Sequence, residues 1–479
     1  MFKKSSIKRL TIVLVALLVF MVALLAACSS ATPFKQRTLP THVDQDKIIG
    51  NGGIAVLYGE WLYYVNGNIS NPASANNAYT EDLRSGAIVR IKLADLESHV
   101  LSVSELDMTS SEKTKEVEKQ VRKYAEMVVP NVYYTGNTTS AALNGLYIFG
   151  DRIYITTPND QLDSKGNVLS DQLVLASYNL GGGDKKTHLV FDSALAQLKL
   201  AQIDNSVYAT YVLDGKLVSY KVGDNKSTTI AEGISSEQFS GDYVYYIDED
   251  GAICQFKIGS ASATVLVPME ESEGHEGHSH KSYSIQKVNN EYVYYTRSDN
   301  GSLDYPEVTG QVLFYANAPV TDDQHSVLID AIPSGTYFCY GDKVVYTMND
   351  DQAPDDQTRY KLVSTSGDGS ELTQLLNERA SLTLLQMQGN VLYYTMSSVT
   401  YTLNLAETDA EPIPYANGYS LSPNGWALPD VMTVGEGDSA VTYMFTLSTD
   451  SVAVVKFNPA TKKNSTTTTY ITLKAESDD

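Results

Sequence analysis

One short phrase recurs along this chain, and its spacing limits the folds that the chain can adopt. Its copies are GEWLYYVN at 59, GDRIYITT at 150, DNSVYATY at 204, GDYVYYID at 241, NEYVYYTR at 290, GDKVVYTM at 341, GNVLYYTM at 389 and, weakly, GDSAVTYM at 437. Successive copies start 91, 54, 37, 49, 51, 48 and 48 residues apart. Most of these intervals match the roughly 40 to 50 residues of a repeat that contains four short strands.

The phrase itself predicts a tight turn followed by a buried strand. Gly, Asp and Asn, which open most copies, tolerate the positive φ that tight hairpin turns require. An apolar residue then stands directly before a Tyr in six copies, at Tyr63, Tyr154, Tyr208, Tyr245, Tyr294 and Tyr393. Adjacent apolar and aromatic residues are typical of a strand that is buried on both faces. We expect the Tyr rings to fill the space between repeats while their hydroxyls find polar partners.

These repeats predict an all-β chain folded as a single β-propeller, because neither a sandwich nor a single barrel would repeat one phrase eight times. We expect the propeller to span residues 50–475, with the phrase as strand B of four strands, A to D, counted from the central axis. Eight blades are favoured. The 37-residue step and the weak eighth copy leave seven blades open.

Three segments resemble the low-density-lipoprotein-receptor type of propeller, whose repeats pair an aromatic YWTD strand with a later DG turn. They are VYYID at 244–248, VYYTR at 293–297 and SGDGSELTQL at 366–375. Trp is absent from the motif position, and most copies lack the DG turn. The resemblance implies a bacterial propeller family without an established activity and, at most, a binding role. No catalytic residues carry over from it.

A helical insertion is expected near 109–128, within the long segment 102–140. Thr109 precedes Glu112 by three residues, which is the spacing of a capping box. Val117, Val121, Tyr124 and Val128 follow at helical intervals. This single apolar stripe predicts that the helix packs on the propeller as a strut or a lid.

The long segments are expected on the face opposite the tight A–B turns, because strands alternate in direction. We assign 67–85, 157–171, 297–309 and 348–358 to B–C connections, and 102–140 and 268–282 to connections from strand D of one blade to strand A of the next. Long insertions on one face of a repeat protein can mark a binding face. They can equally be neutral, because long loops cost little.

Residues 1–27 have the features of a secretory signal peptide. A basic head (Lys3, Lys4, Lys8 and Arg9) precedes an apolar run at 10–25, shorter than the roughly 18 to 20 residues of a spanning helix. The run ends in Leu25-Ala26-Ala27-Cys28, which resembles the bacterial lipobox, where the Cys receives a diacylglyceryl group. The alternative is an ordinary signal with a chance Cys. We therefore expect a mature protein whose Cys28 carries acyl chains such as palmitate, with a tether at 28–49, on the extracytoplasmic side of the cell membrane.

Composition narrows the possible partners. Removal of residues 1–27 takes four positive charges from a formal net charge of −22, so the mature chain carries −26. Phosphate backbones repel such a chain, and we expect no nucleic-acid partner. Beyond Cys28 only Cys254 and Cys339 remain, in different repeats, and we interpret them as buried apolar residues rather than a disulfide. We expect a monomer.

Chemistry-bearing motifs are few. The sequence contains no GxSxG, phosphate-binding glycine loop, HExxH or CxxC. The acidic stretch 349–356 could hold Ca²⁺ or simply be a solvated loop. The stretch 269–283 gathers His275, His278 and His280 beside Glu273 and Glu276, a set that suits Zn²⁺, Cu²⁺ or Ni²⁺. A mobile polar loop is the alternative interpretation.

The leading hypothesis is a lipid-anchored binding or scaffold propeller that is not an enzyme, with an unidentified protein or glycan ligand. The second hypothesis is an enzyme acting on an envelope or extracellular glycan, which would require two carboxylates at glycosidase spacing. The third hypothesis is metal capture by the histidine-rich segment.

If the histidine-rich segment is a functional ligand set, it should bind Zn²⁺ with roughly micromolar or better affinity, weakening as pH falls through about 6.5, where imidazoles protonate. Replacing His275, His278 and His280 with Ala should abolish binding and leave thermal stability unchanged. Calorimetric titration checks both. Millimolar affinity, or unchanged binding by the triple variant, would contradict the metal hypothesis.

Overall fold

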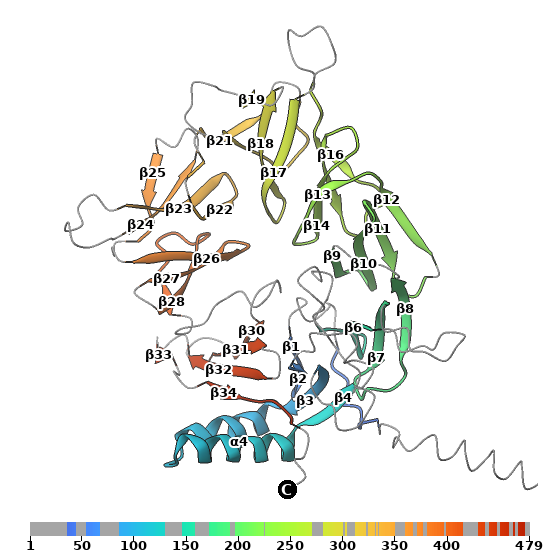
Figure 1. The fold of residues 1–479 in the computed structure, drawn as a ribbon, viewed down its shortest axis with the longest axis vertical. Helices are drawn as coiled ribbons and strands as arrows, with labels where there is room; N and C mark the ends of the chain where they lie inside the picture. The colour runs from blue at the N-terminus through green and yellow to red at the C-terminus, as the bar shows by residue number, and fades with distance from the viewer. Residues whose placement is uncertain are drawn as a thin grey trace, which may run out of the picture.

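A computed structural model gives the fold of the chain. The residues it describes are 36–44, 54–67, 86–129, 146–158, 172–191, 197–224, 226–270, 281–299, 302–303, 312–321, 324–330, 332–333, 335–349, 360–366, 371–376, 381–396, 399–414, 430–435, 440–447, 451–458, 463–464 and 468–474. Within them, eight antiparallel sheets stand around a central axis as the blades of a propeller (Figure 1). The propeller fold and the count of eight blades are confirmed.

The first four blades use the strands in chain order. Blade 1 contains β1 (Ala55–Tyr58), β2 (Trp61–Asn66), β3 (Ala87–Lys92) and β4 (Glu126–Val129); blade 2 contains β5 (Tyr147–Phe149), β6 (Arg152–Pro158), β7 (Leu173–Asn179) and β8 (Lys186–Phe191); blade 3 contains β9 (Gln197–Ile203), β10 (Ser206–Leu213), β11 (Lys216–Lys221) and β12 (Ser227–Ala231); blade 4 contains β13 (Ser235–Ser240), β14 (Tyr243–Ile247), β15 (Ile253–Lys257) and β16 (Thr264–Val267).

The last four blades follow the same order, with one short added strand in each of two blades. Blade 5 contains β17 (Lys281–Asn289), β18 (Tyr292–Asp299), β20 (Leu313–Ala316) and β21 (Ser326–Ile329), with β19 (Ser302–Leu303) paired to β18; blade 6 contains β22 (Tyr337–Tyr340), β23 (Lys343–Asn349), β24 (Tyr360–Ser366) and β25 (Glu371–Gln374); blade 7 contains β26 (Leu382–Gln388), β27 (Val391–Met396), β28 (Val399–Asn404) and β29 (Ile413–Pro414); blade 8 contains β30 (Asp430–Val434), β31 (Val441–Leu447), β32 (Val452–Asn458) and β33 (Lys463–Asn464), with β34 (Thr469–Tyr470) paired to β32.

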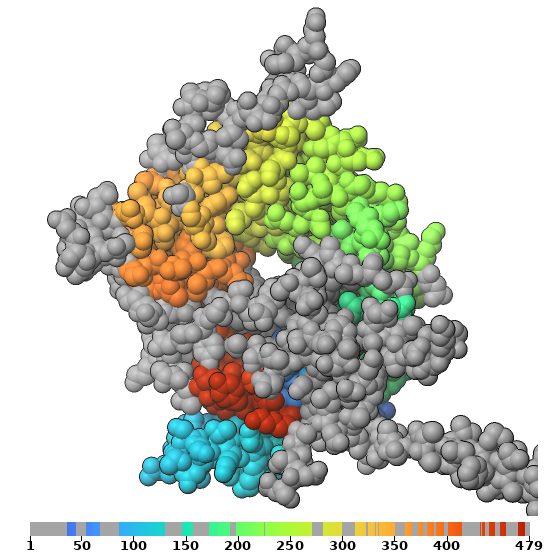
Figure 2. Space-filling model, in the orientation of Figure 1, coloured from blue at the N-terminus to red at the C-terminus, as the bar shows by residue number. Residues whose placement is uncertain are grey.

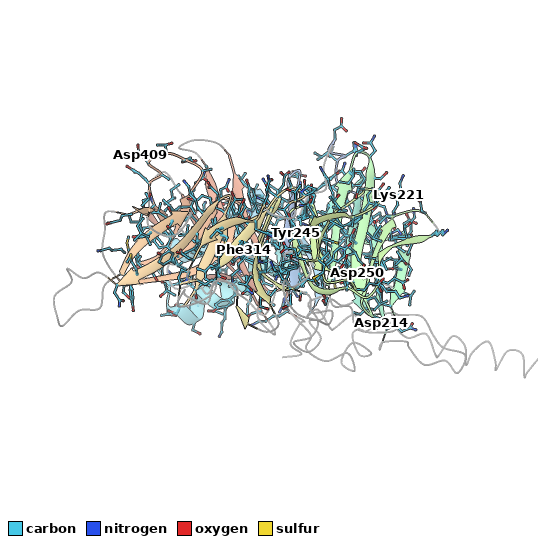
Figure 3. The ribbon with its side chains drawn as sticks, turned by 90° about the horizontal axis from the view of Figure 1, so that it is seen from above. Asp214, Lys221, Tyr245, Asp250, Phe314 and Asp409 are labelled. Carbon is cyan, nitrogen blue, oxygen red and sulfur yellow. The ribbon has the colours of Figure 1, made fainter. Side chains whose placement is uncertain are left out.

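The recurring phrase forms the second strand, B, of every blade, as predicted. In blades 1 to 7 its opening residues make the A–B turns, and in blade 2 both turn residues have positive φ, Gly150 at 55° and Asp151 at 60°. Seen edge-on, Asp214 of a B–C turn lies at one edge of the ring, and Lys221 and Asp409 lie at the opposite edge (Figure 3). The A–B and C–D turns therefore share one face, and the B–C connections lie on the other.

Three Tyr residues of the B strands each join their blade to the next. Tyr63, Tyr245 and Tyr294 are fully buried. The Tyr63 hydroxyl donates to the carbonyl of Leu180 in blade 2 (3.0 Å), Tyr245 to Asn290 in blade 5 (2.8 Å) and Tyr294 to Gly341 in blade 6 (2.9 Å). Each ring fills the space between blades, and each hydroxyl has the partner that a buried polar group requires. At these three positions the predicted role of Tyr in the phrase is confirmed.

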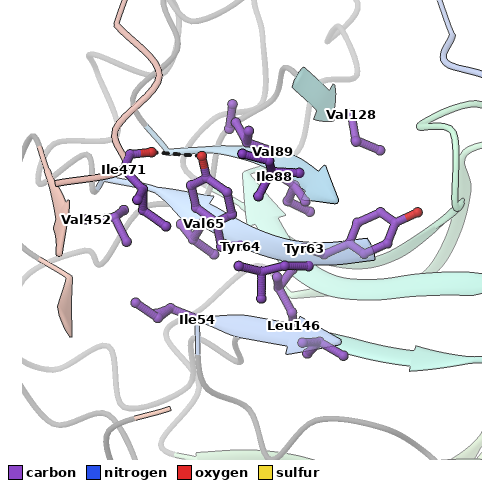
Figure 4. Close-up of a cluster of buried hydrophobic side chains, with 14 of the residues drawn as sticks. Ile54, Tyr63, Tyr64, Val65, Ile88, Val89, Val128, Leu146, Val452 and Ile471 are labelled. Carbon is purple, nitrogen blue, oxygen red and sulfur yellow. Dashed lines mark hydrogen bonds between the residues drawn. The ribbon is translucent and has the colours of Figure 1, made fainter. Parts of the chain in front are cut away.

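The C-terminal segment closes the ring by binding blade 1. The hydroxyl of Tyr64 donates to the carbonyl of Ile471 at 2.8 Å (Figure 4). The fully buried amide of Asn66 donates to the Leu473 carbonyl and accepts from the Leu473 amide, both at 2.8 Å. The same segment is held to blade 8, because the amide of Ile471 donates to the carbonyl of Val452. Residues 468–474 therefore link the last blade to the first.

The helical insertion has the predicted start but a different place in the chain. The turns α3 (Leu93–Asp95), η1 (Leu96–Val100) and η2 (Leu101–Glu105) lead to α4 (Ser110–Tyr124). Thr109 and Glu112 form the predicted capping box, and Val117 and Val121 are buried. However, the insertion joins strands C and D of blade 1, not blade 1 to blade 2, because β4 follows it and pairs with β3. Val128 accordingly lies in β4. The helix contacts β34 outside the ring (Figure 1).

Two other expectations of the chain's organisation are met. The segment 268–282 runs from β16 to β17, as predicted, and the four predicted B–C segments join the second strand of their blade to the third. Cys254 and Cys339 are free and buried. Among the residues in the ranges above, no helix is long and apolar enough to span a membrane.

Replacing Asn66 with Ala should lower the free energy of unfolding by about 2–4 kcal/mol, because two hydrogen bonds are lost and the buried Leu473 groups are left unpaired. Asn404→Ala is the control, since its side chain bonds only exposed groups. Urea unfolding followed by Tyr fluorescence measures both. Equal stability of the two variants would show that this contact does not close the ring.

Candidate functional site

A cavity of about 570 Å³ opens among the A–B turns of blades 5, 6 and 7. Its lining consists of Asn289, Asn290, Glu291, Tyr292, Tyr340, Gly341, Asn390 and Ala406. Small-molecule sites commonly have volumes of roughly 300–1,000 Å³ and a few convergent polar groups. Three side-chain amides, two phenols and one carboxylate meet these criteria, so we take this cavity as the candidate site.

One side chain fixes the three turns relative to each other. The amide nitrogen of Asn289 donates to the carbonyl of Cys339 in blade 6 at 2.8 Å and to that of Gly389 in blade 7 at 2.9 Å. The next residue, Asn290, has a φ of 50°, a conformation that Asn tolerates better than most residues. These hydrogen bonds hold the backbone around the cavity in place, so a ligand can bind without rearranging it.

The aromatic part of the lining is also supported from behind. Tyr292 stacks on Tyr294, with centroids 6.2 Å apart and planes 15° apart, and lies 6.1 Å from the ring of Tyr315. Tyr294 is itself fully buried, and burial raises its pKa. Tyr292 and Tyr340 remain half-buried at the cavity. They can offer phenol groups and ring edges to a ligand at little entropic cost.

The electrostatics of the cavity are simple. Glu291 is the single carboxylate in the lining given above, it is exposed, and it accepts a hydrogen bond from the Tyr243 hydroxyl at 2.9 Å. Burial and the hydrogen bond to Glu291 raise the pKa of Tyr243, so this phenol stays protonated at neutral pH. None of the lining residues is a Lys or Arg. The cavity is suited to uncharged, hydrogen-bonding ligands.

In the space-filling view, the inner edges of blades 4 to 7 border an opening inside the ring (Figure 2). The pocket therefore belongs to three of the four blades that border this opening.

A second polar cluster joins blades 4 and 5 at the base of the histidine-rich segment. Glu270 accepts from Lys281 Nζ at 2.8 Å and lies 3.6 Å from Arg297 Nη1. It also accepts from His325 Nε2, while His325 Nδ1 lies 2.6 Å from the Tyr295 hydroxyl. An ionised carboxylate only accepts, so Nε2 carries a proton, and the contact between Nδ1 and the Tyr295 hydroxyl satisfies the other side of the ring. Tyr295 is fully buried and His325 nearly so, which makes this cluster a structural clamp rather than a ligand site.

Burial alone would raise the pKa of Glu270, but hydrogen bonds from Lys281 and His325 and the charge of Arg297 outweigh it and hold the pKa below its ordinary value. The stability that this carboxylate contributes is therefore present above the unfolded pKa of about 4.3 and is lost as pH falls through the lower folded pKa.

Glu270→Gln should lower the free energy of unfolding by about 1–3 kcal/mol at pH 7, and the difference from the wild type should shrink below pH of about 4. Glu232→Gln is the control, since Glu232 forms an exposed pair with Lys216, and it should cost less than about 1 kcal/mol. Urea titrations between pH 3 and 8 measure both. A pH-independent difference would contradict the clamp.

The site residues predicted from sequence lie outside the described residues. This holds for Cys28 and for Glu273, His275, Glu276, His278 and His280, so the lipidation and metal assignments stay predictions. The ends of the histidine-rich segment are placed, because the amide of Lys281 donates to the carbonyl of Glu270 at 3.0 Å. Within the described part of the chain, no group of three His, Cys, Asp or Glu residues is arranged to hold a metal ion.

The sequence did not predict the cavity, because the long segments indicated a binding surface on the opposite face. One signal was present in the sequence. The fifth copy of the phrase follows Asn289 and opens with Asn290-Glu291, and the seventh opens with Gly389-Asn390, where four of the eight copies have Gly-Asp. An amide in a turn that needs only positive φ suggests a further use for the side chain.

Comparisons with known proteins give no family for the chain. No protein-family model matches it, and no curated protein matches it. Solved structures that are similar include the β-propeller domain of the trilobed protease from Pyrococcus furiosus, at 10% identity and a TM-score of 0.33, covering 69% of this chain and 95% of that one. Oligopeptidase B from Leishmania major has 9% identity and a TM-score of 0.36, covering 87% and 54%. The uncharacterized protein lmo1340 from Listeria monocytogenes has 8% identity and a TM-score of 0.32, covering 66% and 90%. The likeness to the low-density-lipoprotein-receptor type stays a prediction.

Proposed function

We propose that this propeller is a binding module that holds an uncharged glycan segment in the cavity of blades 5 to 7. The observation that carries the proposal is the lining of that cavity, in which Asn side chains and Tyr rings surround a single exposed carboxylate. The fold is compatible with a binding or scaffold role.

The lining has the chemistry that sugars need. A side-chain amide presents a donor and an acceptor side by side, which matches neighbouring hydroxyl groups on a sugar ring. Tyr offers an apolar ring for the C–H face of the sugar and a hydroxyl at its edge. An anionic ligand would find no cation among the lining residues, and a flat protein surface would not use a recess of this volume.

The same lining disfavours glycan hydrolysis, the second hypothesis from the sequence. Glycosidases generally place two carboxyl groups about 5–10 Å apart on either side of the scissile bond. The lining contains only Glu291. Binding without cleavage is the simpler use of such a site. Metal capture by the segment 268–282 remains a separate hypothesis, which the Zn²⁺ titration tests.

We further propose that the module works outside the cytoplasm on a lipid anchor at Cys28. The support is the basic head, the apolar run and the Leu25-Ala26-Ala27-Cys28 sequence. Two acyl chains bury enough methylene groups, at about 0.8 kcal/mol each, to hold a protein stably on a bilayer. A glycan ligand would then belong to the cell envelope or to the surroundings of the cell.

The soluble mature domain should bind oligosaccharides released from purified envelope polysaccharide and peptidoglycan. Glu291→Gln and Asn390→Ala should each weaken binding about 3- to 10-fold, the effect of losing one hydrogen bond to the ligand. Asp214→Asn, in a B–C turn on the opposite face, is the control and should leave binding unchanged. Glycan-array screening followed by calorimetry measures this. Binding to no glycan, or equal binding by all variants, would contradict the proposal.

A further inference from the structure

Residues 36–44, which we call the strap, are built into the ring at blades 1 and 2. The Arg37 amide donates to the carbonyl of Gly181 at 2.9 Å, and Arg37 Nε donates to the carbonyl of Met127 at 2.9 Å. Farther along the strap, the Val43 amide donates to the Tyr58 hydroxyl at 2.8 Å, and His42 Nδ1 lies 2.6 Å from Asp151. Tyr58 also donates to Asp151. The strap therefore bonds the A–B turns of two blades.

A buried arginine depends on this contact. Arg90 is 2% exposed and stacks over the Trp61 ring at 4.2 Å. Its guanidinium pairs with Glu126 at 2.7 Å and donates to the Thr38 carbonyl of the strap at 2.8 Å. Removing the strap would leave part of a buried charge unpaired, which is costly. Arg90 thus ties the strap to blade 1.

A glycine-rich turn leaves room for the strap. A Cβ placed on Gly181 would lie 2.3 Å from the Arg37 carbonyl oxygen, far inside contact distance. Gly181 belongs to the C–D turn of blade 2, at the outer part of the ring, whereas Tyr58 ends the inner strand of blade 1. The chain therefore enters at the rim of blade 2 and runs inward along the face of the A–B turns.

We infer that the strap makes the rim at blades 1 and 2 the membrane-proximal part of the ring and carries the cavity of blades 5 to 7 to the far side. This rests on the proposed anchor at Cys28. Eight residue steps separate Cys28 from Gln36, a reach of at most about 28 Å, so the lipid cannot sit far from the rim of blade 2. In an eight-bladed ring, blades 5 and 6 stand opposite blades 1 and 2 (Figure 1).

Charge favours an orientation in which the ring stands on the bilayer at the rim of blades 1 and 2. It disfavours one in which the strap face lies flat on the bilayer. The A–B turns of the first six blades each carry a carboxylate on that face: Glu60, Asp151, Asp204, Asp242, Glu291 and Asp342. An anionic leaflet repels them. The turn that holds the strap carries Lys185 and Lys186 beside one carboxylate, Asp184, which also pairs with Arg152. Cations are therefore in excess there, and a lysine near an anionic surface contributes about 1 kcal/mol of attraction. The cavity then lies at the end of the ring far from the bilayer, within reach of glycans beyond it.

The test places one fluorophore on the full, lipidated protein in vesicles of phosphatidylglycerol and phosphatidylethanolamine that contain a rhodamine-labelled headgroup. Lys186→Cys and Glu407→Cys are a matched pair, because both residues are exposed and lie on the same face, in blades 2 and 7. Lys186 is the first residue after the C–D turn of blade 2, and Glu407 lies within the C–D turn of blade 7. Cys254 and Cys339 are buried and should not react. We expect energy transfer at position 186 to exceed that at 407 by about twofold or more, because the short tether holds only the former near the headgroups.

Gly181→Ala should displace the strap and add nine residues of free tether, about 30 Å of reach, so that transfer at the two positions becomes nearly equal. Arg37→Ala, a milder change, should act in the same direction. Equal transfer in the otherwise unmodified protein, or stronger transfer at 407, would overturn the orientation and leave the anchor standing. Vesicle binding that is retained by Cys28→Ala would overturn the anchor and the orientation together.

Discussion

Closure of the ring is the constraint on which the rest of this structure depends. A propeller blade has two faces, and each must be covered by a neighbour, so the first and last blades are stable only when they meet. Here the junction is made by residues 468–474, which pair with β32 of blade 8 and bond Tyr64 and Asn66 of blade 1. Closure also removes the open faces and edges that would otherwise favour association with other chains.

The same strand that packs the blades also positions the candidate site. Two Tyr residues of strand B bond the A–B turn of the next blade, Tyr245 at Asn290 and Tyr294 at Gly341. Two of these bonded turns line the cavity, and Asn289 ties both neighbouring blades to the third. A binding surface made of turns is ordinarily mobile. Here the turns are hydrogen-bonded to side chains of neighbouring blades, which restricts their movement. In blade 5 the residues that line the cavity, 289–292, come directly before the buried residues that pack the blades, 293–295.

Sequence patterns predicted the features that local chemistry determines. Each turn-and-Tyr phrase marked a B strand, and Thr109 with Glu112 marked the start of α4. Features that depend on contacts between distant parts of the chain could not be predicted from the sequence. Val128 has helical spacing from Val117 and Val121, but it lies in β4, because strand C of blade 1 finds its partner only after the helical insertion. The cavity depends on hydrogen bonds from Asn289 to residues 50 and 100 positions away along the chain. No local sequence pattern predicts such contacts.

Hydrogen exchange of the C-terminal amides tests the closed ring most directly. Terminal residues usually exchange quickly because they fray. If residues 468–474 close the ring, the amides of Ile471 and Leu473, bonded to Val452 and Asn66, should be as protected as those of β2 and β31 and should exchange with them in one cooperative opening. Exchange of these two amides within seconds, while the blade strands stay protected, would contradict the closed ring described here.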